Sequence, residues 1–487
     1  MATPIPKNRA PMSGREATLA TAGQLRGEAR TEHHGLTTDS RAVSPGAVFV
    51  ALRGETHDGH RYLAAAERAG ATLLVVERGA AKLDELRVDV LEVDDTLRAW
   101  GDLAAFHLRR WREGDRAVRV VAVTGSVGKT TTKELCAALL RAAAGVSAVV
   151  ATAGNLNNRI GVPAMIFTLT EAHRFAVLEC GMSLPGEMGE LARIVRPDVA
   201  AVTLIGLAHA ENLGGTREDV AREKGALLRG AAAGATLIVS ADDALSVAEA
   251  QAAAQLESGR ALRVFSRHAP SDLAVVERES LGFRGARLRL EWRGGRCVSV
   301  AFPLVGEGAA VDFACAALAV EAALGRPVTD EELGAAAAAV SSIPGRAAVA
   351  VRSDGAIVVD DTYNASPQSM DNALASLSET ARADGRRAVC VLGEMRELGP
   401  QAAEAHDELG DAVARASVGL FIGCGGLMDR AVARAKEKGV PAVAAGSVEA
   451  AAALALREVT PRDVVLVKGS RSIGTERVVR ALMGDAR

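Results

Sequence analysis

The sequence has no uninterrupted apolar stretch of 18 residues, no paired cysteines and no excess of one charge. We therefore expect no membrane span, and because the first two dozen residues are polar and lack an apolar signal core, we expect no export either. The six cysteines are scattered singly, without a Cys-x-x-Cys pair, which is typical of reduced thiols in a cytoplasmic protein. Lys and Arg number 57 against 60 Asp and Glu, so no overall positive field exists to hold nucleic acid.

Lysine is also scarce, with eight in 487 residues, so each one stands out. Hydrophobic residues make up 49% and charged residues 24%, which is ordinary for a folded protein with large cores. Disorder over most of the length is therefore excluded. A chain of this length is expected to form about three domains.

Short apolar runs alternate with helix-like stretches after the first two dozen residues. The first series comprises Ala47–Leu52, Ala71–Glu77 and Val88–Val93. The second comprises Val118–Thr124, Phe175–Glu179, Val199–Leu204 and Thr236–Ser240. The third follows a break at Ser342–Arg346 and comprises Ala356–Asp361, Ala388–Gly393, Val418–Cys424 and Val464–Lys468. Such runs between helices are typical of buried parallel strands, whose ligands bind at the carboxyl ends.

These series predict an α/β protein of three domains. We expect a flexible tail over residues 1–23 and a small mixed α/β N-terminal domain over 24–114. A central P-loop, parallel-sheet ATPase domain over 115–327 and a C-terminal Rossmann-like domain over 328–487 follow. Two sheets of this kind can close a cleft between the carboxyl ends of their strands.

A phosphate-binding loop is predicted after the strand Val118–Val123 and before the helical stretch Lys133–Ala143. It reads Thr124, Gly125, Ser126, Val127, Gly128, Lys129, Thr130 and Thr131. Glycines let backbone N–H groups approach phosphates, Lys129 adds a point charge, and Thr130 can hold Mg²⁺. Val123 stands where the strict G-x-x-x-x-G-K-[ST] pattern has its first glycine. A chance Gly-rich turn is the alternative, but the order of strand, loop and helix favours nucleotide binding.

Two further polar residues end or follow predicted strands of the central domain. Glu179 ends one strand, where its carboxylate would lie near the Mg²⁺ of the loop, although a capped surface residue is an equal interpretation. His209 lies in the loop after Val199–Leu204, and a neutral imidazole is a possible metal ligand. A structural histidine is the commoner case.

Lys224 lies on the apolar stripe of a predicted helix. Thr216 and Asp219 resemble a capping box, and Val220, Lys224 and Leu228 then share one helix face. The lysine either reaches to solvent at the edge of the stripe or is a paired or chemically altered lysine at a site.

In the third domain, a polar string ends one strand and opens the helical pattern Ser369–Leu377. The string contains Asp360, Asp361, Thr362, Tyr363, Asn364, Ala365, Ser366 and Pro367. Paired carboxylates with Tyr and Asn are costly in a core, so their place at a strand end favours a site over a solvated turn. The segments Gly393–Gly399 and Val467–Arg471 have the same character.

Together these residues resemble the Mur ligase family of peptidoglycan synthesis over nearly everything after residue 24. The resemblance includes Thr38–Arg41 with Asp58–His60, the variant loop, Asn155–Pro163 and, most diagnostic, the Asp-Asp-x-Tyr-Asn-Ala-x-Pro string. The resemblance implies an ATP-dependent ligase that transfers a phosphoryl group to a peptide carboxylate, after which an amine attacks the acyl phosphate. It implies UDP-N-acetylmuramoyl-tripeptide and D-alanyl-D-alanine as substrates, and a protein that acts as a monomer in the cytoplasm.

The resemblance also assigns roles to residues. Lys129, His209 and Lys224 would be catalytic, and Thr130, Glu179, His209 and Lys224, the last carbamylated by carbon dioxide, would hold two Mg²⁺ ions. ATP would contact the loop together with Asn155, Asn158, Arg346, Asp360, Tyr363 and Asn364. The uridine-linked substrate would contact Ser40, Arg41, Asp58, Gly59 and His60.

The chain departs from the family where relatives commonly carry His-Asn, the usual adenine contact, because it has Gly308-Ala309. Ala226, Arg159 and Ser366 are further departures, and none touches the inferred phosphoryl or metal positions. Another Mur-type or folylpolyglutamate-type amide ligase is one alternative. A nucleotide switch or a noncatalytic ATP binder is another, although the guanine signature Asn-Lys-x-Asp is absent.

Overall fold

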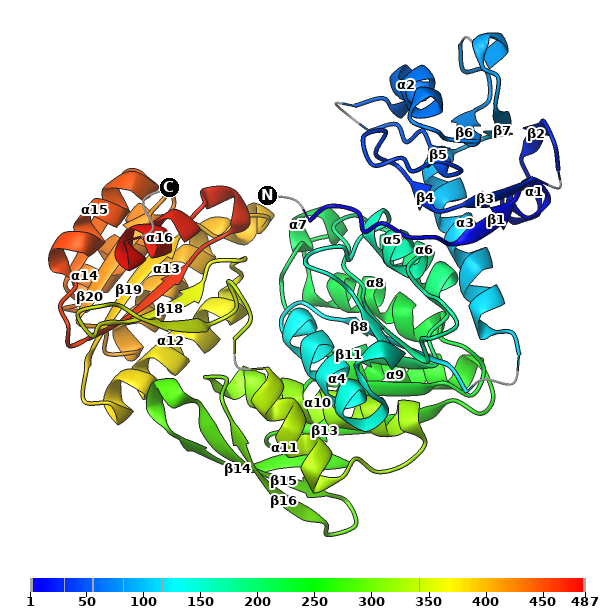
Figure 1. Cartoon of the computed structure of the whole chain (residues 1–487). Helices are drawn as coiled ribbons and strands as arrows, with labels where there is room; N and C mark the ends of the chain where they lie inside the picture. The colour runs from blue at the N-terminus through cyan, green and yellow to red at the C-terminus, as the bar shows by residue number, and fades with distance from the viewer. Residues whose placement is uncertain are drawn as a thin grey trace.

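The computed structural model describes residues 3–29, 31–54, 57–81, 83–114, 117–340 and 342–484. These residues form sheets of two, five, nine and six strands. Figure 1 shows an N-terminal and a C-terminal domain that flank a central domain. The predicted α/β class with parallel sheets in three domains is confirmed. Among the residues described, no helix has the length and apolar character that crossing a bilayer demands.

The N-terminal domain is built on a five-stranded sheet in the order β2-β7-β6-β5-β4, in which only β2 is antiparallel to its neighbour. Its elements are β2 (Gln24–Arg26), β4 (Leu36–Thr37), β5 (Val48–Val50), α2 (Leu63–Arg68), β6 (Leu73–Glu77), β7 (Asp89–Val93) and α3 (Thr96–Arg112). Helix α3 leads into the central domain, where the indole N–H of Trp100 donates to the Ile160 carbonyl at 3.0 Å. Buried side chains form one continuous core across both domains at this helix.

Residues 11–21 have regular secondary structure where a flexible tail is predicted. Strand β1 (Pro11–Ser13) pairs antiparallel with β3 (Glu32–His34), and helix α1 (Gly14–Thr21) follows. Ser13 and Glu16 form a capping box that begins α1. A three-residue strand inside a polar stretch carries too short an apolar pattern to be recognised from the sequence.

The central domain is built on a nine-stranded sheet in the order β16-β15-β14-β13-β12-β11-β8-β10-β9. Its strands are β8 (Arg119–Thr124), β9 (Val149–Ala151), β10 (Phe175–Glu179), β11 (Val199–Val202), β12 (Thr236–Ser240), β13 (Ala261–Ser266), β14 (Leu273–Ser280), β15 (Ala286–Trp292) and β16 (Cys297–Phe302). Its helices are α4 (Lys129–Ala144), α5 (Gly161–Ile166), α6 (Glu187–Val195), α7 (Ala210–Leu213), α8 (Arg217–Arg229), α9 (Ala244–Leu256), α10 (Glu307–Leu324) and α11 (Asp330–Ala339). Strand β14 is parallel to β13, but β15 pairs antiparallel with both β14 and β16, and this extension of the sheet was not predicted from the sequence.

Helix α11 lies with the central domain, although the prediction assigns residues 328–487 to the C-terminal one. Its buried residues Leu333, Ala336 and Ala337 belong to the hydrophobic core of the central sheet and α4. The chain crosses to the C-terminal sheet only after this helix. The sequence break at Ser342–Arg346 is therefore the better place for the boundary.

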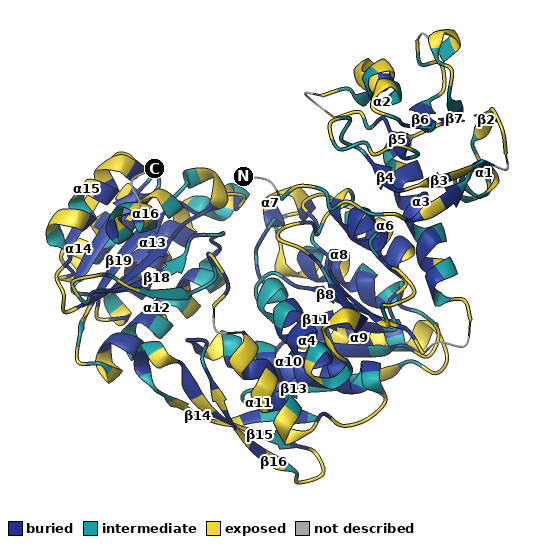
Figure 2. Cartoon of the chain, in the orientation of Figure 1, coloured by how far each residue is buried: buried dark blue, intermediate teal, exposed yellow. Residues whose placement is uncertain are grey.

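The C-terminal domain has a six-stranded sheet in the order β17-β18-β22-β19-β20-β21, parallel except for β17. Its strands are β17 (Ala348–Val351), β18 (Ile357–Asp361), β19 (Arg387–Gly393), β20 (Leu420–Cys424), β21 (Ala442–Ala445) and β22 (Asp463–Lys468). Its helices are α12 (Pro367–Ala383), α13 (Ala402–Arg415), α14 (Met428–Glu437), α15 (Val448–Glu458) and α16 (Glu476–Met483). Figure 2 shows its strands buried beneath helices whose outer faces are exposed.

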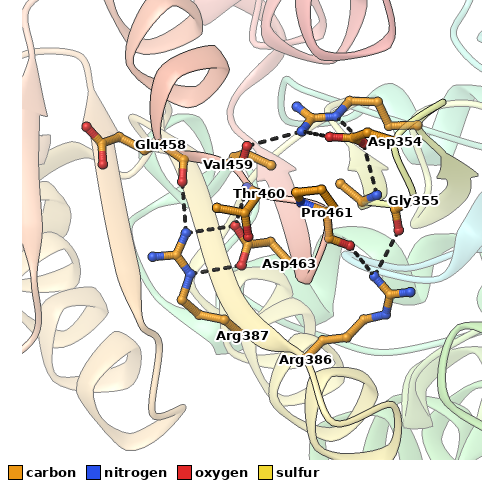
Figure 3. Close-up of polar contacts among 11 residues, drawn as sticks. Asp354, Gly355, Arg386, Arg387, Glu458, Val459, Thr460, Pro461 and Asp463 are labelled. Atoms are coloured by element: carbon orange, nitrogen blue, oxygen red, sulfur yellow. Dashed lines mark hydrogen bonds and ion pairs between the residues drawn. The ribbon is translucent and has the colours of Figure 1, made fainter.

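A cluster of arginines fastens the amino ends of β18, β19 and β22 (Figure 3). Arg387 donates from Nε and Nη2 to the two carboxylate oxygens of Asp463 at 2.9 and 2.7 Å, and also from Nη2 to the Glu458 carbonyl. Burial raises the pKa of Asp463, but the hydrogen bonds from Arg387 and the Thr460 N–H outweigh it, so the pKa is lowered overall. The pair holds the adjacent parallel strands β19 and β22 in register.

We expect Arg387→Ala to lower the free energy of unfolding of the C-terminal domain by about 2 kcal/mol, because the buried Asp463 carboxylate loses its partner. A carboxylate whose pKa is lowered by folding stabilises the folded state fully at pH values above its pKa in the unfolded chain. This stabilisation is lost as pH falls through its pKa in the folded protein. The difference in free energy of unfolding between variant and parent should therefore become smaller at acid pH. Urea unfolding at neutral and acid pH measures it, with Arg457→Ala, an exposed arginine on α15, as the control. An equal loss in both variants would contradict the assignment.

Candidate active site in the interdomain cleft

The predicted phosphate loop connects the central strand β8 to α4. Gly125 and Gly128 have φ values of +148° and +91°, and a Cβ added at Gly125 would lie 2.0 Å from Thr203 Oγ1. Both positions therefore require glycine. Helix α4 begins at Lys129 without a side-chain cap on its first N–H groups, which leaves the positive end of the helix facing the loop. This arrangement suits a phosphate group.

Lys129 lies across this loop, and its Nζ donates to the Gly125 carbonyl at 2.7 Å. Burial lowers the pKa of Lys129 to about 8, an effect that the nearby Glu179 carboxylate opposes and the Arg346 charge reinforces. An anion bound on the loop would stabilise the protonated amine and replace the carbonyl as its partner.

Thr130 connects the loop to the end of β10 and to the segment that precedes β17. Its hydroxyl donates to Glu179 Oε2 at 2.9 Å and accepts from Arg346 Nη2 at 2.9 Å. The other oxygen of Glu179 accepts from Asn157 Nδ2 at 2.7 Å. Thr130 and Glu179 thus present oxygen atoms of the kind that Mg²⁺ prefers, beside the place for phosphate.

A cleft of about 530 Å³ lies between the central and C-terminal domains at the carboxyl ends of their strands. On the central side it is lined by the loop and by Glu179 and His209. On the C-terminal side it is lined by the turn after β18, and the Arg346 guanidinium lies 4.0 Å from the centre of the Tyr363 ring. The cleft joins residues that are more than 200 positions apart in the chain.

Lys468 holds the turn after β18 in place. This buried lysine donates from Nζ to Asp361 Oδ2 at 2.7 Å and to the Asn364 carbonyl at 2.8 Å. Asp361 lines the cleft, whereas the predicted Asp360 is not among the lining residues, and its carboxylate accepts from the Thr362 hydroxyl at 2.6 Å. Of the two adjacent carboxylates, the structure therefore favours Asp361 as the one that faces a ligand.

Comparison with known proteins agrees with this geometry. Residues 32–107 match the Mur ligase family catalytic domain, 123–320 the Mur ligase middle domain and 345–471 the Mur ligase glutamate ligase domain. The chain is 33% identical to the UDP-N-acetylmuramoyl-tripeptide–D-alanyl-D-alanine ligase of Escherichia coli K12, over 92% of this chain and 93% of the other. The chain belongs to the Mur ligase family.

Two solved structures of this family share the fold over nearly all of the chain. The MurF structure from Acinetobacter baumannii superposes with a TM-score of 0.85 at 28% identity and covers 98% of this chain and 100% of its own. The MurF structure from Thermotoga maritima in complex with ADP has a TM-score of 0.78 at 27% identity, over 92% and 97% of the two chains. The domain arrangement is thus that of Mur ligases.

The remaining predicted metal ligands of this Mur ligase do not form a cluster with Glu179. His209 has a φ of +65°, and its Nδ1 forms an ion pair with Glu397 Oε2 at 2.5 Å. This contact lowers the pKa of Glu397. Lys224 lies 1% exposed on α8. Within the described part of the chain, no group of three or more His, Cys, Asp or Glu is arranged to hold a metal ion.

The predicted asparagines have different positions in the cleft wall. Asn155 and Asn158 both line the cleft. Asn158 is also structural, because its Oδ1 accepts from the N–H groups of Ile160 and Gly161 at the start of α5. The sequence analysis missed Asn157, the partner of Glu179, because an asparagine between two others carries no signal of its own.

The predicted substrate residues of the N-terminal domain lie apart from the cleft, and none of the five lines it. Arg41 pairs with Asp39 through two hydrogen bonds and is 88% exposed, while Ser40 lies beside it. His60 Nδ1 is 2.7 Å from Asp58 Oδ1, and its Nε2 accepts from the Glu77 N–H at 3.0 Å. Both nitrogens of His60 are therefore used within the protein, where they fix the segment that contains Gly59.

The sequence analysis also missed Asp312, on the first turns of α10. A Cβ added at Gly128 would lie 2.3 Å from Asp312 Oδ1, so the carboxyl group lies against the phosphate loop. Burial raises its pKa to about 8, although the nearby Thr132 hydroxyl and the charge of Arg346 act in the other direction. At neutral pH the group is mainly protonated and does not repel an anion on the loop.

We expect ATP to bind less tightly as pH rises through about 8, because Asp312 then places a negative charge beside the phosphates. Lys129 loses its proton in the same range and weakens binding in every variant that keeps it. The effect of Asp312 is therefore isolated by comparing the parent with Asp312→Asn. Between neutral and alkaline pH, the dissociation constant for ATP should rise roughly threefold to tenfold less in Asp312→Asn than in the parent. Calorimetric titration from about pH 6.5 to about pH 9 measures it. Asp330→Asn on α11 is the control, and a variant profile identical to the parent would contradict the prediction.

Proposed function

We propose that the chain is an ATP-dependent amide ligase that joins D-alanyl-D-alanine to UDP-N-acetylmuramoyl-tripeptide. The products would be UDP-N-acetylmuramoyl-pentapeptide, ADP and phosphate, in peptidoglycan precursor synthesis. The observation that carries the proposal is the phosphate loop opening into a cleft between two sheets, in a chain similar over 92% of its length to a ligase with this name.

The residues present fit ATP and Mg²⁺. The uncapped start of α4, the two glycines with positive φ and the Lys129 amine suit a polyphosphate. The Thr130 hydroxyl and the Glu179 carboxylate, already within 2.9 Å of each other, form an oxygen donor set suited to Mg²⁺. The Mg²⁺ ions would neutralise negative charge on the phosphoryl group and on the oxygens between which it is transferred. We assign a second ion to His209 and a carbamylated Lys224.

In this mechanism the protein positions groups rather than attacking the substrate itself. Lys129 holds the transferring phosphoryl group, and the peptide carboxylate takes it to form an acyl phosphate. The amine of D-alanyl-D-alanine then attacks the acyl carbon, and phosphate leaves. Arg346, which contacts both Thr130 and the Tyr363 ring, would keep the C-terminal wall closed over the phosphates.

Phosphate release tests the proposal. Purified protein with ATP and Mg²⁺ should release phosphate only when both UDP-N-acetylmuramoyl-tripeptide and D-alanyl-D-alanine are present, and mass spectrometry should find the pentapeptide product. Release with a different carboxylate and amine would keep the ligase chemistry but move the protein to another Mur-type or folylpolyglutamate-type step. The absence of release with every pair would favour an ATP binder that ligates nothing.

The proposal also includes the domain boundaries, the place of the uridine-linked substrate and the cellular compartment. We place the domains at residues 24–114, 115–341 and 342–487, which moves the second predicted boundary past α11. The N-terminal domain, with Ser40, Arg41 and Asp58–His60, would hold the uridine-linked substrate. The chain would act as a cytoplasmic monomer, where both substrates and ATP are available.

A further inference from the structure

The β14–β15 hairpin of the central sheet reaches the C-terminal domain, and Figure 1 shows its tip beside α12. We call this hairpin, residues 273–292, the arm. Its tip is the turn Gly282–Arg284, where the Phe283 ring packs against the hydrophobic core of the C-terminal sheet and α12. The arm therefore joins the two domains through a contact that is not part of the cleft wall.

A β-bulge decides which way Arg278 points from the arm. Val275 lies opposite Leu290, and the register then shifts by one residue, so that Val276 has no partner on β15. Arg278 lies opposite Leu288, and both leucines are buried on the inner face of the arm. Residues directly opposite each other share one face of a sheet. The bulge thus turns Arg278 inward, where strict alternation from Val275 would turn it to the outer face.

The inward guanidinium of Arg278 forms an ion pair with α12. Its Nη1 donates to the two carboxylate oxygens of Glu379 at 2.6 and 2.7 Å. The Arg278 side chain is only 6% exposed, whereas that of Glu379 is 35% exposed. Among the described residues, Glu379 is the one ion-pair partner found for Arg278, and the buried Nε of Arg278 has no partner. The charge of Arg278 is therefore neutralised only when α12 lies against the arm.

Two further contacts lie on either side of this ion pair along the second half of α12. The carboxylate of Asp384, which follows the helix, accepts from the Phe283 N–H at 3.1 Å. A Cβ added at Gly282, where φ is +64°, would lie 2.3 Å from Asp384 Oδ1. A Cβ added at Gly306, before α10, would lie 2.4 Å from Ser376 Oγ. At both glycines, α12 therefore packs directly on the backbone of the central domain.

The first residues of α12 belong to the cleft wall. The helix begins at Pro367, immediately after the turn that carries Tyr363 into the cleft. Glu379 follows Pro367 by twelve positions, which is about 18 Å along a helix. A helix packed along its length moves as a unit, so its contacts with the arm also determine where Tyr363 lies. The Arg346 guanidinium, 4.0 Å from the centre of the Tyr363 ring, donates to Thr130 on the phosphate loop.

We propose that Arg278 is a positioning residue of the ligase. Through Glu379, it holds α12 in the orientation in which Arg346 and Tyr363 meet the phosphate loop. Neither member of the ion pair lines the cleft, so its effect on the reaction is on the geometry of the reacting groups. The effect on turnover rests on the proposed function, whereas the effect on the arrangement of the two domains does not.

The two single alanine variants should differ, because they leave different charges behind. Arg278→Ala leaves a carboxylate that water can reach, and should lower kcat about fivefold. Glu379→Ala leaves an unpaired guanidinium under α12, and should lower kcat about twentyfold. Adding Arg278→Ala to Glu379→Ala removes that buried charge and should bring the loss back to about fivefold. KM for the uridine-linked substrate should stay within about twofold in all three, because the arm and α12 contact only the central and C-terminal domains.

Turnover and small-angle X-ray scattering of the whole protein test the proposal. With ADP and Mg²⁺ present, Glu379→Ala should have a larger radius of gyration than the parent. Arg287→Ala is the matched control, because its ion pair with Glu279 lies within the arm and both side chains are more than half exposed. It should change neither kcat nor the radius of gyration.

Three results would overturn the positioning role of Arg278. They are a kcat of Glu379→Ala within about twofold of the parent, a double variant slower than Glu379→Ala, and an unchanged radius of gyration in Glu379→Ala. A general loss of folding would give the second result, because two damaging substitutions then add. If the parent ligates nothing, the proposed function fails, and the scattering comparison still decides whether the arm holds α12.

Discussion

Replacing Lys129 with alanine should lower the rate of phosphate release roughly a thousandfold, because the developing charge on the phosphoryl group loses its nearest cation. The Lys129 amine lies on the loop itself, 2.7 Å from the Gly125 carbonyl. Arg346 is a neighbouring cation, but its guanidinium donates to Thr130 and lies over the Tyr363 ring.

The measurement is kcat with saturating ATP, Mg²⁺ and both substrates. Lys129→Arg should not restore the rate, because a planar guanidinium cannot replace a compact ammonium at this position. Lys436→Ala on α14, an exposed lysine, is the control for loss of charge. If Lys129→Ala kept more than about a tenth of the parent rate, the lysine would be a binding residue and not part of phosphoryl transfer.

The sequence predicted the central site well where the pattern is local. Strand β10 and strand β12 have the predicted bounds, and α8 begins after Thr216 with Lys224 on its buried face. The loop from Gly125 to Lys129 lies between strand and helix as expected. In each case the signal comes from neighbouring residues, through apolar periodicity or a turn that only glycine permits.

The parts that the sequence did not predict depend on contacts between distant segments. Asp312 meets Gly128 only because α10 packs against the phosphate loop within the central domain, and Glu397 meets His209 only because the C-terminal domain faces the central one. The choice of Asp361 over Asp360 depends on the alternation of side chains along β18, which a pair of identical residues cannot reveal. Such contacts follow from the topology of the fold, and no local pattern in a single sequence indicates them.

The surroundings of Lys224 distinguish the two interpretations that the sequence left open, a lysine that reaches solvent and a lysine at a site. A lysine that reaches solvent at the edge of an apolar stripe is excluded, because Lys224 is 1% exposed. Burial lowers its pKa well below the ordinary value, and the charge of Lys129 lowers it further. Its amine forms no hydrogen bond or ion pair with another described residue, whereas the equally buried Lys133 donates to the Thr152 carbonyl at 2.9 Å. A buried, unpaired amine with a lowered pKa, next to the phosphate site, is a group that can be modified.

We therefore expect Lys224→Ala to lose roughly a hundredfold or more in kcat and to regain part of it when a short carboxylate such as acetate is added. In the parent, the amine would add to CO2, forming an N–C bond and releasing a proton, and the resulting anion could join a metal ion. Lys133→Ala is the matched control, because its defect is structural and acetate should not repair it. A carbamate carbon signal in ¹³C NMR with labelled CO2 should be present in the parent and absent in Lys224→Ala. Full activity of the unsupplemented variant, or equal rescue of both variants, would contradict the carbamate and leave Lys224 as a buried structural lysine.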